Sequence, residues 1–119
     1  MSYIPLSRAD LAGATAVVVD ADYTTSGTSI LKCIDDAVVV LNFTPKDRET
    51  VLVHLSTSNT IQIVGDIHIY NAAYYNIAEY NIAEYGGTTL TFSTKDTTVH
   101  LMYVREFGEW LAIWLRRRY

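Results

Sequence analysis

Hydrophobic and polar residues alternate with a period of two along most of this chain, which is the pattern of half-buried β-strands. A clear case is the pair Leu90 and Phe92, whose neighbours in the chain are hydroxyl residues. Runs of this kind, rich in β-branched and aromatic residues, are separated by turn-forming residues. The predicted strands are residues 14–20, 29–34, 37–43, 50–55, 60–64, 67–70, 88–93, 98–104 and 109–115. Their close spacing predicts an all-β protein, a compact antiparallel β sandwich or a prism-like module.

Two of the predicted strands are apolar on both faces. Residues 37–41 read Ala-Val-Val-Val-Leu, and residues 109–115 read Glu-Trp-Leu-Ala-Ile-Trp-Leu after a hairpin turn. In an antiparallel sheet one face normally meets the core and the other meets water, so such strands must be covered twice. In so short a chain the expected cover is another copy of the same chain. The predicted subunit interface consists of Val38, Val40, Leu111, Ile113, Trp114 and Leu115.

Two segments depart from the strand pattern. Residues 1–13 mix apolar and charged residues around a proline, which indicates an extended N-terminal arm or an ordinary disordered terminus ahead of a single β domain over residues 14–119. Residues 70–85 repeat a five-residue unit that begins with tyrosine, a period that fits neither helix nor strand. This insertion is interpreted as a Tyr-rich loop or a short helix stopped by two glycines, with a pentapeptide-repeat β-helix as the alternative.

The tyrosines of the insertion form a candidate ligand loop. Each phenol ring offers a flat apolar face and a polar hydroxyl, which suits a sugar or a protein partner, and packing against a neighbouring subunit is the alternative. The candidate residues are Tyr70, Tyr74, Tyr75, Tyr80 and Tyr85.

Composition supports one domain with surplus apolar surface. Of the 119 residues, 50% are hydrophobic and only 18% are charged, which predicts subunit contacts. The net charge of −4 disfavours nucleic acid as a partner, and the arginines at 116–118 indicate a solvated end or pairing with a neighbour's acidic residues. No apolar run is long enough to predict a membrane span. The single cysteine, Cys33, is expected to be a buried structural thiol.

No motif predicts catalysis, a cofactor or a metal. The chain has no Gly-x-Ser-x-Gly, Cys-x-x-Cys or His-Glu-x-x-His sequence and no phosphate-binding glycine loop, so it is predicted not to be an enzyme. His54, His68 and His100 have no metal-ligand spacing, although a threefold axis could gather three copies of one of them. Asp20 and Asp22 share a strand face and suggest either a solvated strand end or a Ca²⁺ site.

The order of elements from residue 17 onward resembles a β module that recurs in structural proteins of tailed bacteriophages, in tail spikes, tail fibres and capsid-bound proteins. The matching segments are residues 19–23 as an opening strand and turn, 34–41 as a second hairpin, 51–55 with 59–65, 87–92, and the closing hairpin 99–104 and 109–115 around Gly108.

The resemblance implies a virion protein with a mechanical role that assembles as a trimer. A chain of this size without a fibre shaft is more similar to a capsid decoration (cement) protein or a short head fibre than to a tail spike. The N-terminal arm would then anchor the protein to the capsid or another virion protein, through Ile4, Pro5, Leu6 and Arg8. The alternative is a tail fibre or spike module that binds a receptor or a host-surface glycan through the Tyr-rich loop.

Overall fold

The computed structural model describes residues 13–69 and 87–117, and every regular element in these ranges is a β-strand. The strands are β1 (Thr15–Val19), β2 (Tyr23–Thr24), β3 (Ser29–Cys33), β4 (Ala37–Val40), β5 (Thr50–Leu55), β6 (Ile61–Ile69), β7 (Gly87–Phe92), β8 (Thr97–Val104) and β9 (Glu109–Arg117). The prediction of an all-β protein is confirmed. Among these residues there is no helix of the length and apolar character needed to cross a membrane.

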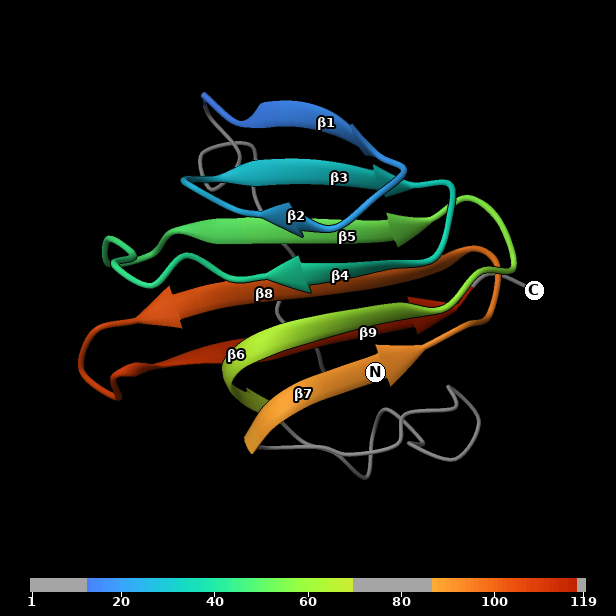
Figure 1. Cartoon of the computed structure of the whole chain (residues 1–119). Coiled ribbons are helices and arrows are strands. Elements are labelled where there is room, and N and C mark those ends of the chain that lie inside the picture. The colour runs from blue at the N-terminus through green and yellow to red at the C-terminus, as the bar shows by residue number, and fades with distance from the viewer. Residues whose placement is uncertain (1–12, 70–86, 118–119) are drawn as a thin grey trace.

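All nine strands belong to one sheet that coils into a compact, nearly closed, barrel-like shape (Figure 1). The order across the sheet is β1-β3-β5-β8-β9-β6-β4-β2, and β7 pairs with β6 beside this path. Strands β1 and β2 are consecutive in the chain, but they occupy the two ends of this order and do not pair with each other. The sheet is therefore open between them.

The strand pairing differs from the antiparallel arrangement that the sequence predicts. Five of the eight pairings are parallel, namely β1 with β3, β3 with β5, β2 with β4, β4 with β6 and β6 with β9. Only β5 with β8, β6 with β7 and β8 with β9 are antiparallel. The prediction of an antiparallel module is therefore wrong, although the closing hairpin, β8 with β9, is confirmed.

The parallel pairs arise because the chain coils instead of reversing direction within one ladder. The ladder of β1, β3 and β5 lies behind the ladder of β2, β4 and β6, and each short connection carries the chain from one ladder to the other (Figure 1). The predicted hairpin over residues 34–41 does not form for this reason: β3 and β4 follow one another in the chain but belong to different ladders.

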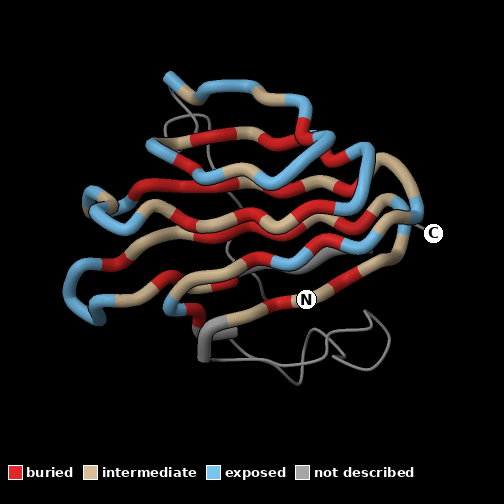
Figure 2. Tube along the Cα trace, in the orientation of Figure 1, coloured by how far each residue is buried: buried red, intermediate tan, exposed pale blue. Residues whose placement is uncertain are grey.

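The core lies between the two ladders and is filled by side chains at equivalent positions of successive coils. Val19, Cys33 and Leu55 are aligned in the first ladder, Val39 and Ile63 are aligned in the second, and all five are buried. Figure 2 shows buried positions alternating with less buried ones along the strands. Alternate residues of these strands point into the core, as the period of two in the sequence predicts.

Two aspartates connect successive coils. The carboxylate of Asp22, the residue before β2, accepts a hydrogen bond from the backbone N–H of Val38 at 2.9 Å. The carboxylate of Asp36, the residue before β4, accepts one from the N–H of Thr60 at 2.7 Å. Each aspartate thus binds the residue at the equivalent position of the next coil, so the same contact is repeated and fixes the register at this end of the second ladder.

Strand β6 combines two predicted strands. The predicted strands 60–64 and 67–70 form one strand with an irregularity between residues 64 and 67, where it leaves β4 and pairs with β9. Gly65 lies at this bend, and a Cβ atom added to it would be 3.0 Å from Cδ1 and 3.1 Å from Cβ of the buried Leu41. Any larger residue here would force the side chain of Leu41 to shift, so the close approach of the bend favours glycine. Strand β2 was not predicted, because two residues are too few to show a period.

Candidate subunit interface

The predicted interface residues of β4 lie on the outer face of the second ladder. Ala37 and Val39 point into the core, so Val38 and Val40 point outward, and both are half-buried. Their neighbours in register on β6 are Gln62 and Val64. The outer face of this ladder therefore has apolar side chains on two adjacent strands, as the double apolar pattern of residues 37–41 indicates.

Strand β9 also carries apolar residues on both faces, as its sequence indicates. Trp110 and Ala112 belong to the core, and the Trp110 ring contacts the Tyr103 ring edge to face, with centroids 5.8 Å apart. Leu111, between them, points to the outer face and is half-buried. The remaining predicted interface side chains lie outside the described part of the chain: Ile113, Trp114 and Leu115. Because β6 lies between β4 and β9, the predicted interface is divided between two strands of the outer surface that do not pair.

A second apolar row, on the first ladder, was not predicted. Ala16, Ile30 and Leu52 are aligned across β1, β3 and β5, and the next position on β8 is His100. Their alternation with core residues places these side chains on the outer face, where Ile30 and Leu52 are half-buried. The sequence of each strand alone is consistent with one core face and one solvent-exposed face. The row can therefore be recognised only when the strands are aligned in register.

His100 is buried in this outer row. Its residue is 4% exposed, and burial lowers the pKa of the imidazole from 6.5 to about 4. The ring is therefore neutral at physiological pH, because burial disfavours the charged form of an imidazole.

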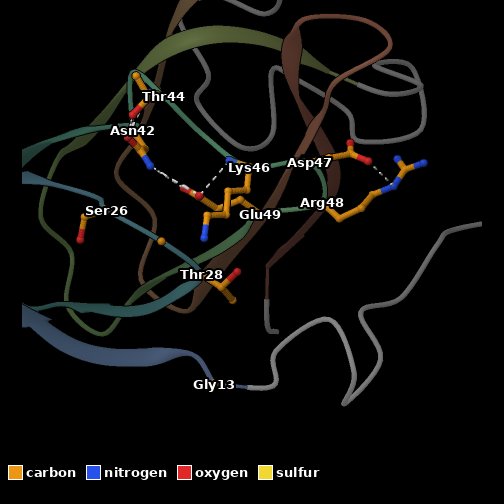
Figure 3. Close-up of a pocket in the computed structure, with 10 residues that line it drawn as sticks. Gly13, Ser26, Thr28, Asn42, Thr44, Lys46, Asp47, Arg48 and Glu49 are labelled. Carbon is orange, nitrogen blue, oxygen red and sulfur yellow. Dashed lines mark hydrogen bonds and ion pairs between the residues drawn. The ribbon is translucent and has the colours of Figure 1, made fainter.

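The end of the sheet that carries loop 41–49 contains a polar cavity of about 620 Å³ (Figure 3). Glu49, only 6% exposed, accepts hydrogen bonds from the side-chain amide of Asn42 at 3.1 Å and from the backbone N–H of Lys46 at 3.2 Å. On the same side, the hydroxyl of Thr28 accepts the N–H of Thr50 at 3.2 Å. These polar groups bind one another and hold the loop in place, so the cavity is best explained as part of the loop structure.

Two exposed phenylalanines lie at the same end. Phe43 is 84% exposed on loop 41–49 and Phe107 is 64% exposed on the turn between β8 and β9. The loop and the turn are connected, because the N–H of Arg105 donates to the carboxylate of Asp47 at 3.0 Å. This end therefore carries two exposed aromatic side chains that are separate from the faces of the ladders.

A cluster of His54, Thr98 and Asp96 has the residue types of a catalytic triad but not the geometry. The Nδ1 atom of His54 is 2.8 Å from the Thr98 hydroxyl, whereas its Nε2 atom is 4.0 Å from the Asp96 carboxylate, too far for a hydrogen bond. The His54 and Asp96 side chains are 37% and 38% exposed, and no residue of the cluster lines the cavity. We assign this cluster no catalytic role.

The described residues contain no group of three or more His, Cys, Asp or Glu side chains placed to hold a metal ion. The side chain of His68 lies outside the described part. Cys33 is 1% exposed, and burial raises the pKa of its thiol to about 11. A thiol that is both inaccessible and protonated is a packing group, as predicted.

The other predicted sites lie outside the described residues. These are the capsid-anchor residues Ile4, Pro5, Leu6 and Arg8, and the candidate ligand loop, Tyr70, Tyr74, Tyr75, Tyr80 and Tyr85. Both stay predictions.

Comparison with known proteins found no matching family model, no similar curated protein and no similar solved structure.

Proposed function

We propose that this protein is a non-enzymatic structural protein that acts as a homo-oligomer, a virion component of the capsid decoration or short head-fibre type. The observation that carries the proposal is the presence of outward-facing apolar residues on both ladders. Val38, Val40 and Val64 occupy the outer face of the second ladder, and Ile30 and Leu52 occupy that of the first.

These rows favour a subunit contact over a solvated surface. Full burial of a Val, Ile or Leu side chain is worth about 1.5–3 kcal/mol relative to exposure, so covering several half-buried ones supplies a few kcal/mol. Isolated apolar residues on a surface are ordinary, whereas aligned rows on adjacent strands form patches of the kind that associate. A second copy of the chain is the partner that the double apolar pattern predicts.

The coiled architecture fits a mechanical role. In stacked coils each strand contacts mainly its neighbours in the ladder, and the repeated units present long, regular surfaces to partners. The carboxylates of Asp22 and Asp36 hold successive coils together, and that of Glu49 holds loop 41–49 in place. The assignment to a virion, with a capsid or other virion protein as partner, depends on the resemblance of the order of elements along the chain, with their packing and turn residues, to the phage module.

The mass of the protein in solution tests the oligomer. Sedimentation or light scattering at micromolar concentration should give a stable multiple of the 13.4 kDa chain. Val40→Lys should shift the distribution toward smaller species by placing a charge on the outer face, while Ser58→Lys, at an exposed turn, is the control. A wild-type protein that is monomeric at every concentration contradicts the proposal.

The virion assignment has a separate test. Antibody labelling of particles that carry the protein should mark the capsid surface. Labelling confined to the tail end excludes decoration of the capsid, and absence of the protein from purified particles excludes the virion.

A further inference from the structure

Strand β1 is an edge strand of the described sheet. Among the described strands it pairs only with β3, and it forms the upper edge of the sheet in Figure 1. The N–H of Thr15 donates to the carbonyl of Thr28 at 3.0 Å, so Thr15 faces β3. Because backbone groups of successive residues point to opposite sides of a strand, the N–H and C=O groups of Ala16 and Val18 face the open side.

The sequence of β1 itself carries none of the features that normally prevent strand addition. Proteins protect edge strands with charges, proline, bulges or very short length, and the sequence Thr-Ala-Val-Val-Val has none of these. The side chain of Val18 is left on the outer face, where the residue is 59% exposed. Val17 points inward but is only partly buried at this end of the core. An added strand would cover apolar groups on both faces.

The edge is complementary to itself. If two copies of β1 run antiparallel about a twofold axis through Val17, then Ala16 of each copy lies opposite Val18 of the other. These are the two residues whose backbone groups face outward, so each opposed pair exchanges two hydrogen bonds. The acidic residue nearest the strand, Asp20, comes opposite Ala14 of the other copy, so the pairing brings no like charges together.

We propose that the β1 edge is a contact between two copies of this chain, paired antiparallel with Val17 opposite Val17, so that the sheet continues from one subunit into the next. This inference rests on the proposed homo-oligomer and assigns it a twofold contact, the commonest symmetry among homo-oligomers. The assembly then contains an even number of chains: a dimer, or a hexamer if the threefold association implied by the phage resemblance is also present.

Cysteine scanning along β1 tests both the contact and its register. In this pairing the two Val17 Cα atoms are about 4.5 Å apart, within the range of a disulfide, whereas the two Val18 Cα atoms are about 9 Å apart, beyond it. With copper phenanthroline as oxidant, Val17→Cys should give a covalent dimer. Val18→Cys should give much less, although residue 18 is the more exposed. Equal cross-linking of both variants, or cross-linking of Val18→Cys alone, overturns the inference.

A second variant tests the hydrogen bonds. Val18→Pro removes an N–H that faces the open edge, a position at which edge strands tolerate proline. It should halve the mass of the assembly, while Val18→Thr keeps the N–H and serves as the control. Circular dichroism checks that each variant is folded.

The outcomes separate this inference from the proposed function. A wild-type trimer, or an unchanged mass for folded Val18→Pro, overturns the β1 contact but leaves the oligomer in place. A wild-type monomer overturns both.

Discussion

Stability should fall between pH 7 and pH 5 because of one side chain, His100. Its imidazole is 4% exposed, and burial lowers its pKa to about 4 in the folded protein, against 6.5 for a solvated histidine. Well above pH 6.5 the ring is neutral in both folded and unfolded chains, so it contributes almost no pH dependence there. As pH falls from 6.5 toward 4, the unfolded chain takes up a proton that the folded chain does not, and unfolding becomes more favourable.

The size of this effect follows from the two pKa values. At pH 5 the unfolded imidazole is almost fully protonated and the folded one is mostly neutral, which corresponds to a loss of about 2 kcal/mol in the free energy of unfolding. That is a large share of the roughly 5–15 kcal/mol that stabilises a typical domain. The loss should be nearly complete by pH 4 and absent between pH 7 and pH 8.

Urea denaturation of the wild type and of His100→Gln at pH 8, 7 and 5 measures this contribution. The carboxylates contribute the same pH dependence to both proteins, so the difference between them isolates the imidazole. The wild type should lose about 2 kcal/mol more than the variant between pH 7 and pH 5. An equal loss in both proteins would refute the assignment of the effect to His100, as would a difference that already exists between pH 8 and pH 7.

Three further outcomes are expected. Gly65→Ala should lower the free energy of unfolding by about 1–3 kcal/mol in a urea titration, since its Cβ has no room, whereas Gly27→Ala, with open space around it, should change it by less than about 0.5 kcal/mol. Asp36→Ala should cost about 0.5–1 kcal/mol by removing an acceptor between coils, and equal behaviour of Asp20→Ala would contradict the role of that contact. Cys33 should react with Ellman's reagent only after unfolding in guanidinium chloride, so fast labelling of the native protein would show that its burial is wrong.

The candidate interface was only partly predictable. The strands of Val38, Val40 and Leu111 are apolar on both faces, and this pattern can be seen in the local sequence. In the structure these three residues point outward, as expected. The row of Ala16, Ile30 and Leu52 was missed, because its members come from three separate strands and meet only through the parallel register.

Some missed features do have a signal in the chain. Asp22 and Asp36 each come directly before a strand, so an aspartate at the start of a strand marks the contact with the next coil, although the aligned residues of this ladder, such as Tyr23 and Val39, are 16 residues apart. The open edge at β1 also has a local signal, a run of five uncharged residues without proline. Glu49 has none: a carboxylate in a polar loop looks the same whether it is solvated or buried under an amide.

The sequence by itself determined that the chain is all-β, where most strands lie, which side chains enter the core, and that the last two strands form a hairpin. These properties depend on neighbours a few residues apart, through the period of two and the turn residues. Only the tertiary structure decided that most of the strand pairings are parallel, which rows meet on the outer faces, and that β1 is an edge strand of the described sheet. The physical reason is that a strand alternates in the same way whether its partner is parallel or antiparallel, so the choice of partner depends on how distant coils stack.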